Sequence, residues 1–303
     1  MTVQPEDLEI VDAHHHLWDL GSGRYHWLTG PPEPNFLLGD YTALRRDYLP
    51  ADYRLDAHGL NIIATVHIEA EGDRDRALEE TQWVHRMNAA HGMPNAVVAH
   101  TWFHVPEVEA NLAAHARHPL VRGIRSKPKT TAAPQRQPLE GPGTMQDPAW
   151  RRGLGMLAKH NLCWDLRVPF WHLEEAAEIA ALFPAIPIVL NHTGLPWDRS
   201  EEGLALWRRG MRALAACPNV CCKISELGLK NAAWTVDGNR RVVREAIGIF
   251  GIDRCMFASN FPVAGLRVAY RTQIAGLLAI LADLSRAELD KLFRDNARRF
   301  YRL

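Results

Sequence analysis

The first apolar run of the chain reads Ile10-Val-Asp-Ala-His-His-His16, and it predicts a β-strand that ends in histidines. Side chains alternate between the two faces of a strand, so we expect Asp12, His14 and His16 on one face and His15 on the other. Two imidazoles at positions i and i+2 can converge on a metal ion or a substrate oxygen at the C-terminal end of a strand. The alternative is a structural histidine cluster without chemistry.

Seven more short runs rich in β-prone residues follow this one along the chain. The eight predicted strands are Glu9–His15, Ile62–Glu69, Ala96–Phe103, Val121–Ser126, Leu162–Val168, Ile186–His192, Val220–Ser225 and Cys255–Ser259. Stretches with helical periodicity lie between them, such as Arg76–Ala90, Pro148–His160, Leu173–Leu182, Glu201–Ala216 and Arg240–Phe250. Strands that alternate with helices indicate βα units and a parallel sheet. Eight such units predict an α/β fold, a distorted (β/α)8 TIM barrel, built as one domain over residues 1–303.

Local signals mark two helix starts and two long loops. Asp147 before Pro148 is typical of an N-cap followed by proline at the first helical position. The capping-box pattern Ser285-Arg-Ala-Glu288 predicts the start of the last helix. Gly21–Asp47 and Lys127–Met145 lack periodicity, and loops of this length in a compact domain usually carry function. Both follow strands, so we expect them on the face where barrel active sites form.

The overall composition is that of a soluble globular chain. Its 303 residues contain 35 Lys and Arg and 35 Asp and Glu, so the balanced charge gives no reason to expect a nucleic-acid or membrane partner. The five cysteines form no C-x-x-C pair, which argues against a disulfide framework. The polar N-terminus does not resemble a signal peptide. We therefore expect a cytoplasmic protein with a small-molecule substrate, and a homo-oligomer is compatible with the sequence.

Charged residues stand near the ends of the second, fourth and fifth predicted strands. Glu69 needs a metal ion, a cation or solvent, because an unpaired buried carboxylate is unstable; a salt bridge at the barrel rim is an equal alternative. Arg125 and Lys127 share one face and suit a substrate carboxylate or a developing oxyanion. Asp165 and Arg167 also share a face, and we interpret Asp165 as part of an ion-pair layer between strands.

The sixth, seventh and eighth predicted strands end in polar residues. His192 stands just before Thr-Gly, where a barrel places a catalytic base or a ligand. Lys223 and Ser225 share one face of the seventh strand. Asn260 follows the eighth strand, and its amide can orient water or donate a hydrogen bond but has no useful basicity. Trp18, Trp27 and Trp171 are candidate walls of a pocket, although isolated aromatic residues more often pack in cores.

Several motifs in order along the whole chain resemble those of the amidohydrolase superfamily, amidohydrolase-2 type, in its lactonase branch. The matching segments are Asp12-Ala-His-His-His-Leu-Trp18, Tyr25-His-Trp-Leu28, Arg122-Gly-Ile-Arg125, Leu190-Asn-His-Thr-Gly194, Lys223-Ile-Ser225, Met256-Phe-Ala-Ser-Asn-Phe-Pro-Val263 and Asp295-Asn-Ala297 with Tyr301. The resemblance implies a distorted (β/α)8 barrel that acts on sugar-acid lactones, or on ring substrates such as pyrone dicarboxylate or muconolactone.

The resemblance also implies roles for individual residues. His14, His16 and His192 match the strand-1 pair and the strand-6 histidine of the family. The strand-8 position of the family is typically an Asp that activates water, whereas this chain has Asn260. Asn260 in place of this Asp leaves open which residue is the general base. It also leaves open whether a metal ion is bound, since members of the branch do not all require a metal ion.

We therefore expect an enzyme that hydrolyses a lactone with activated water. The predicted catalytic residues are His14, His16, His192 and Asn260. His192 is the predicted general base, and Glu69 is the next candidate for that role. The predicted substrate-binding residues are Arg125, Lys127, Trp18, Trp171 and Lys223. One divalent metal ion, Zn or Mn, would be held by His14, His16, Glu69 and His192; metal-free catalysis is the alternative. The rival functions are a metal-dependent decarboxylase of an aromatic or unsaturated acid, and a binding protein without catalysis.

Overall fold

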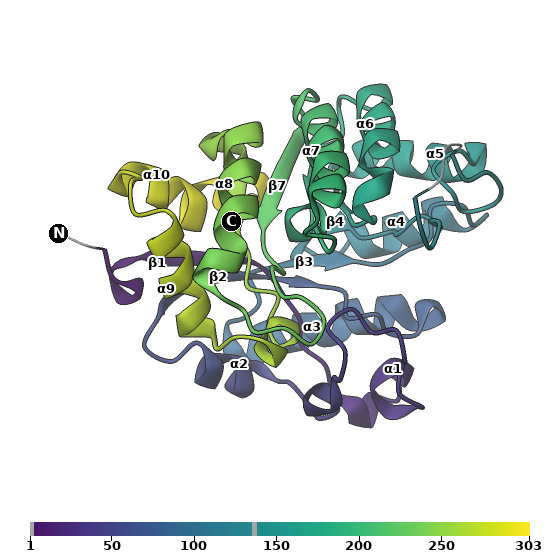
Figure 1. Ribbon diagram of the computed structural model, residues 1–303. Helices are drawn as coiled ribbons and strands as arrows, with labels where there is room; N and C mark the ends of the chain where they lie inside the picture. Colours follow the sequence, from purple (N-terminus) through teal and green to yellow (C-terminus); the bar gives the residue numbers. More distant parts are fainter. Residues whose placement is uncertain (1–2, 135–137) are drawn as a thin grey trace.

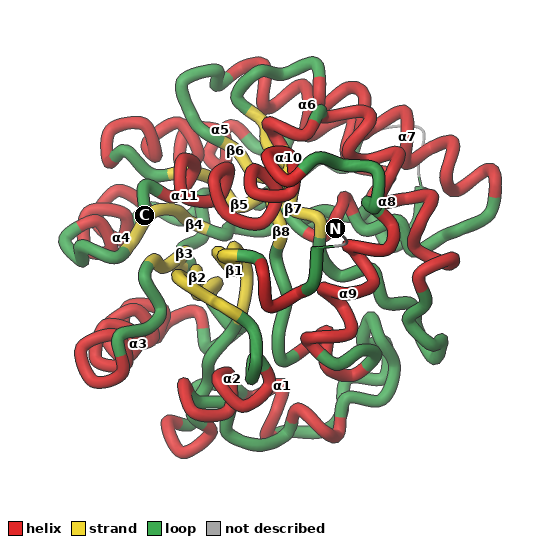
Figure 2. The backbone as a smooth tube through the Cα atoms, turned by 90° about the vertical axis from the view of Figure 1, so that its left-hand side faces the viewer, coloured by secondary structure: helices red, strands yellow, loops and turns green. Residues whose placement is uncertain are grey.

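The structure is a computed structural model that describes residues 3–134 and 138–303. In these residues, eight parallel strands form one sheet in which each strand pairs with the next along the chain (Figure 1, Figure 2). The strands are β1 (Glu9–His15), β2 (Asn61–Ile68), β3 (Ala96–Ala99), β4 (Val121–Ile124), β5 (Cys163–Leu166), β6 (Ile188–Leu190), β7 (Val220–Ile224) and β8 (Cys255–Phe257). The predicted (β/α)8 barrel is confirmed, although most strands end earlier than expected.

Helices surround this sheet, as the view in Figure 2 shows. Their bounds are α1 (His26–Thr29), α2 (Pro50–Asp56), α3 (Ala77–His91), α4 (Val108–Ala116), α5 (Pro148–Gly155), α6 (Leu173–Leu182), α7 (Glu201–Ala215), α8 (Val236–Phe250), α9 (Tyr270–Ile280), α10 (Arg286–Asp290) and α11 (Asn296–Tyr301). Both predicted helix starts are confirmed. The Asp147 carboxylate accepts from the Ala149 N–H, and Ser285 forms the capping box with Glu288. The last helix is divided by a π-helical turn, Lys291–Asp295.

The barrel closes between β1 and the segment that follows β8. The Asn260 N–H donates to the His14 carbonyl at 2.7 Å, and the His16 N–H donates to the Phe261 carbonyl at 2.8 Å. This seam lies at the C-terminal ends of both strands. Closing the barrel therefore also brings the strand-1 histidines beside Asn260.

Strand β1 changes face within its histidine-rich half. The Asp12 carboxylate points to the helix layer, where it accepts hydrogen bonds from tyrosine hydroxyls of α2 and α9, both at 2.8 Å. His14 points into the barrel, with Nδ1 3.4 Å from Lys223 Nζ. The register of β1 on β2 shifts between Asp12 and His15. The prediction that Asp12 and His14 share a face is therefore wrong, because alternation does not continue through a bulge.

A charged pair is sealed inside the barrel, beneath its mouth. Lys223 Nζ lies 2.5 Å from Asp165 Oδ1, and both side chains are fully buried. The Tyr301 hydroxyl also donates to this carboxylate, at 2.9 Å to Oδ2. The ion-pair interpretation of Asp165 is confirmed. The substrate contact predicted for Lys223 is not seen, because its ammonium is committed to Asp165 and reaches no cavity.

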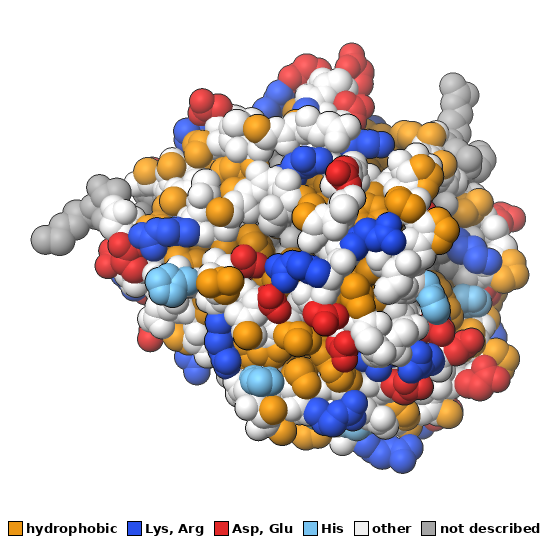
Figure 3. Space-filling view, turned by 90° about the horizontal axis from the view of Figure 1, so that it is seen from below, with side chains coloured by type: hydrophobic (Ala, Val, Ile, Leu, Met, Phe, Trp, Pro, Cys, Tyr) orange, Lys and Arg blue, Asp and Glu red, His pale blue; other side chains and the backbone are white. Residues whose placement is uncertain are grey.

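The face of the molecule in Figure 3 carries acidic and basic side chains side by side, with hydrophobic side chains gathered toward its lower middle. Within residues 3–134 and 138–303, no helix is long and apolar enough to cross a bilayer. All five cysteines are free thiols, and four of them are buried.

We predict that Lys223→Met lowers the free energy of unfolding by about 3–5 kcal/mol, because it leaves the buried Asp165 carboxylate without its counter-ion. Denaturant titration at neutral pH measures this loss. The double variant Lys223→Met/Asp165→Asn should recover part of it, since a neutral amide still accepts from Tyr301. A Lys223→Met protein of unchanged stability with only a raised KM would support the substrate role instead.

Candidate active site

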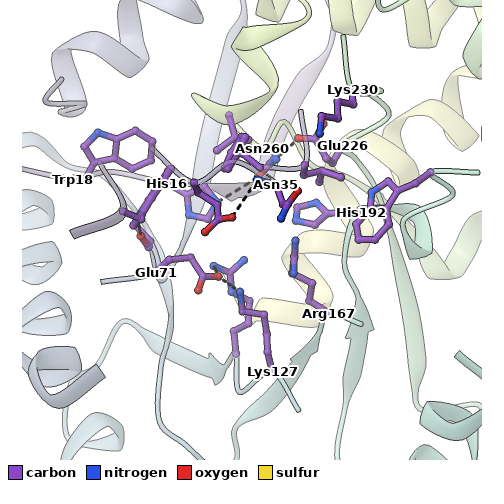
Figure 4. Close-up of a pocket in the computed structure, with 18 residues that line it drawn as sticks. His16, Trp18, Asn35, Glu71, Lys127, Arg167, His192, Glu226, Lys230 and Asn260 are labelled. Atoms are coloured by element: carbon purple, nitrogen blue, oxygen red, sulfur yellow. Dashed lines mark hydrogen bonds and ion pairs between the residues drawn. The ribbon is translucent and has the colours of Figure 1, made fainter. Parts of the chain in front are cut away.

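A cavity of about 770 Å³ opens at the C-terminal end of the barrel (Figure 4). Strand ends form its floor, and one of the two long loops predicted to be functional, Gly21–Asp47, forms part of its wall. The other, Lys127–Met145, contributes Lys127, and its residues 135–137 lie outside the described residues. Aromatic rings of this wall pack on one another: Trp18 meets Trp27 edge to face at 5.6 Å, and Trp27 stacks on Phe36 at 5.9 Å between ring centroids. This side of the cavity suits a flat or ring-shaped ligand.

The three predicted histidines meet at the cavity floor. His16 and His192 line the cavity, and His14 lies directly beneath them. The Nε2 atoms of His14 and His16 are 3.3 Å apart, and the His14 and His192 rings are 4.6 Å apart between centroids. Burial, together with nearby Lys and Arg side chains, holds the pKa of each imidazole far below its usual value, to about 3 for His16. All three are therefore neutral at physiological pH.

The proton positions on two of these imidazoles follow from their neighbours. Lys223, paired with Asp165, can only donate, so His14 Nδ1 accepts from it at 3.4 Å and the His14 proton is on Nε2. The Ile68 carbonyl can only accept, so His16 Nδ1 carries the proton that bonds it at 2.8 Å. His14 Nε2–H then donates to the lone pair of His16 Nε2. Each neutral ring thus has one defined tautomer.

Asn260 joins these histidines to a carboxyl group. Its Nδ2 donates to Glu226 Oε2, and its Oδ1 lies 3.2 Å from His16 Nε2. The pKa of Glu226 is raised to about 7, mainly because burial disfavours the charged form. Both Asn260 and Glu226 have a positive φ, of 59° and 44°, which turns the chain sharply after β8 and β7. Such strained backbone is concentrated at functional sites.

On the opposite wall, cations and carboxylates neutralise one another. Arg125 Nε lies 2.6 Å from Glu69 Oε1, and the Glu71 carboxylate contacts both Arg125 and Lys127. Arg74 completes the cluster at 2.6 Å from Glu69 Oε2. Glu69 is thereby engaged by two arginines, and it does not line the cavity. The structure does not bring Glu69 into the arrangement predicted for a ligand or a base.

Like Lys230, Arg167 is a cation of the cavity without a hydrogen-bond or salt-bridge partner among the described residues. It lines the cavity at the end of β5, and within the described residues no hydrogen bond or salt bridge engages its guanidinium. Figure 4 shows it directed toward the space between Lys127 and His192. An unpaired guanidinium in a cavity is a ready site for a carboxylate, which it can bind through two parallel hydrogen bonds.

The amidohydrolase family model matches residues 11–303. This chain belongs to the amidohydrolase family. It is 39% identical over 299 residues to the uncharacterized protein y4mH of Sinorhizobium fredii, covering 98% of this chain and 99% of that one. It is 28% identical over 306 residues to an L-fucono-1,5-lactonase of Burkholderia multivorans, covering 97% and 96%. A solved amidohydrolase of Burkholderia multivorans with bound zinc superposes with a TM-score of 0.79 at 25% identity, over 97% and 99% of the two chains.

In this amidohydrolase, the predicted metal ligands do not form a complete site. No group of three or more His, Cys, Asp or Glu side chains is placed to share one ion in the part of the chain that the structure describes. Coordination by His14 Nε2 would require its proton on Nδ1, which faces the Lys223 ammonium. The surrounding Arg125 and Arg167 also disfavour a divalent cation. The donors present do not fit the predicted ion, and we derive no chemical step through one.

Of the other residues predicted to bind substrate, three line the cavity and Trp171 does not. Arg125, Lys127 and Trp18 line the cavity as expected. Trp171 lies outside it, because its indole N–H bonds the Thr131 carbonyl at 3.2 Å and its ring packs against Trp197, which forms the wall.

Sequence reasoning missed Glu226 as a site residue. The available signal was a glutamate directly after the predicted strand Val220–Ser225. Its positive φ, which the sequence does not mark, accompanies its position at the cavity.

We predict that the purified amidohydrolase retains at most one divalent ion per chain, weakly held, and that dialysis against a chelator leaves its catalytic rate unchanged. The reason is that the cavity offers neutral imidazoles among cations and no bridging carboxylate. Elemental analysis before and after dialysis measures the metal content. Two stoichiometric ions, or loss of activity that zinc or manganese restores, would contradict this prediction.

Proposed function

We propose that this amidohydrolase hydrolyses a lactone that carries a carboxylate. The observation that carries the proposal is the pairing, in one cavity, of neutral His16 and His192 with the unpaired guanidinium of Arg167. The sequence similarity to an L-fucono-1,5-lactonase over almost the whole chain supports the same reaction class. Arg167 would bind the substrate carboxylate, and the Trp18 and Trp27 rings would pack against the lactone ring.

His192 is suited to stabilise the tetrahedral intermediate. Its Nδ1 lies 3.2 Å from the Ser225 hydroxyl. If that hydroxyl donates, the proton of the neutral ring is on Nε2 and can be donated to the lactone carbonyl oxygen. A donor fixed in a water-poor site stabilises a developing oxyanion without reorganisation, and removing one such donor typically lowers kcat about 10²–10³-fold.

The test of the function is proton release from a panel of lactones, with and without a chelator. The panel contains sugar-acid lactones, muconolactone-type rings and pyrone carboxylates, each beside a neutral analogue. We expect turnover that is fastest for a carboxylate-bearing ring. Release of CO2 from aromatic acids without proton release from any lactone would favour a decarboxylase, and thermal stabilisation by lactones without turnover would favour a binding protein.

We predict that Arg167→Met raises KM for carboxylate-bearing lactones by about 10- to 100-fold, since a charged hydrogen bond contributes about 1.5–3 kcal/mol. Neutral lactones should show no such rise in KM. Arg209→Met on α7, whose side chain is 63% exposed, is the matched control for loss of one surface arginine. An Arg167→Met enzyme with unchanged KM for every anionic lactone would exclude this role.

A further inference from the structure

The reaction needs a group that takes a proton from water, and most titratable side chains of the cavity are poorly suited to it. The pKa of Glu71 is lowered to about 2: burial and the Glu69 charge raise it, but the cations around Glu71 outweigh them. Glu69 is locked by Arg125 and Arg74. The neutral histidines have pKa values far below neutrality, so each is a weak proton acceptor.

Glu226 differs from these groups in its hydrogen bonding. It lines the cavity although its exposed fraction is only 3%. One oxygen, Oε2, accepts from Asn260, while Oε1 has no hydrogen-bond partner of good geometry among the described residues, with the Gly228 backbone amide nearby. A buried polar atom left unpaired in this way calls for an explanation, and catalysis is one of the recognised reasons.

The charged groups around Glu226 come from several elements. Arg167 faces it from the end of β5 and Arg267 from the turn after β8, and both lower its pKa. Lys230 lies on its own loop, and His192 lies across the cavity floor, as Figure 4 shows. Burial outweighs these cations, and the pKa of about 7 leaves the carboxyl able to gain and lose a proton at neutral pH.

We propose that Glu226 is the general base of this enzyme and that Asn260 positions it. The inference rests on the proposed lactone hydrolysis. The Glu226 carboxylate takes a proton from water as the water oxygen bonds to the lactone carbonyl carbon. The tetrahedral intermediate then breaks its bond to the ring oxygen, and the Glu226 acid returns the proton to that oxygen. The products are the open hydroxy acid and the regenerated carboxylate.

An amide at position 260 can form a hydrogen bond with Glu226 both when Glu226 is a carboxylate and when it is the protonated acid. Toward the Glu226 carboxylate, Asn260 donates through Nδ2, as observed. Toward the Glu226 acid, the amide turned by 180° accepts through Oδ1 and donates through Nδ2 to His16 Nε2, 3.2 Å away, whose lone pair is then shared with the His14 Nε2–H at 3.3 Å. An aspartate there would repel the carboxylate state. The proton acceptor expected after strand 8 is thus placed after strand 7, with Asn260 as its neutral partner.

We predict that Glu226→Gln lowers kcat by about 10²–10⁴-fold. It should also abolish the rise of kcat/KM with pH through about 7, the pKa of Glu226. The sign follows from the mechanism, because the base acts only as the carboxylate, which forms as pH rises through that pKa. Asn260→Asp should move the rise to more alkaline pH and lower the rate at pH 7, since a second carboxylate raises the pKa of Glu226. These values are measured on the fastest lactone of the panel.

Two further variants make the assignment specific. The double variant Glu226→Gln/Asn260→Asp exchanges carboxylate and amide between the two positions, and its kcat should exceed that of Glu226→Gln by at least about ten-fold. His192→Asn should lower kcat and keep the pH dependence. Glu174→Gln on α6, 47% exposed, controls for the loss of one carboxylate. Circular dichroism and melting curves confirm that each variant is folded.

The outcomes separate this inference from the proposed function. Suppose that the wild-type enzyme turns over a lactone. If Glu226→Gln then keeps its kcat, or keeps the pH-dependent rise of kcat/KM at a lower kcat, the role of Glu226 is overturned and the proposed function stands. Loss of the rise in His192→Asn alone would assign the base to His192. A raised KM with unchanged kcat in Glu226→Gln would show a substrate contact instead. A wild-type enzyme that turns over no lactone overturns both proposals.

Discussion

The hydrogen-bonded seam between β1 and the segment after β8 is the constraint on which the site depends. The Asp12 carboxylate accepts from the Ser259 N–H at 2.8 Å and from its hydroxyl at 2.6 Å. One residue after Ser259 and two residues after Asp12, the Asn260 N–H donates to the His14 carbonyl. Because Asp12 is fully buried, these bonds form in a low dielectric, where an unpaired carboxylate would be strongly destabilising. The bonds that close the barrel thus also fix the distance between the histidines and Asn260.

A directed chain of hydrogen bonds passes through the histidines at this seam. It begins at the Lys223 ammonium, passes through His14 and His16, and ends at the Ile68 carbonyl. A donor-only group at one end and an acceptor-only group at the other leave a single arrangement for two neutral rings. The buried pair of Lys223 and Asp165 therefore has a role beyond stability, since it determines which nitrogen of each histidine carries a proton. The H-x-H pattern in isolation suggests a metal site. In this structure its two histidines are neutral and are hydrogen bonded to each other.

The sequence predicted the barrel well because hydrophobic runs and capping signals are local. It also placed His16, Arg125, His192 and Asn260 at one end of the barrel, since all follow parallel strands. It failed where the backbone departs from regular geometry. The bulge in β1 separates Asp12 from His14, and Glu226, which sequence reasoning overlooked, reaches the cavity through a residue of positive φ. Neither irregularity has a glycine or proline to mark it. Arg167 and Asp165 share a strand face, but only packing shows that Lys223 reaches Asp165 and leaves Arg167 free.

The charge balance of the cavity connects recognition with reactivity. Arg125 and Lys127 are neutralised by Glu69 and Glu71, so the charged lining groups left to respond to a ligand are Lys230, Glu33 and, central to the proposed reaction, Arg167 and Glu226. Arg167 and Glu226 are not hydrogen bonded to each other, yet Arg167 lowers the pKa of Glu226. A carboxylate bound to Arg167 neutralises this guanidinium and adds a negative charge to the cavity, so the pKa of Glu226 rises in the complex. In the proposed reaction, an anionic substrate thereby makes Glu226 a stronger base once it is bound, whereas a neutral analogue leaves its basicity unchanged. The same arginine would then select the substrate and, in the free enzyme, hold the pKa of Glu226 down until an anionic substrate neutralises the guanidinium.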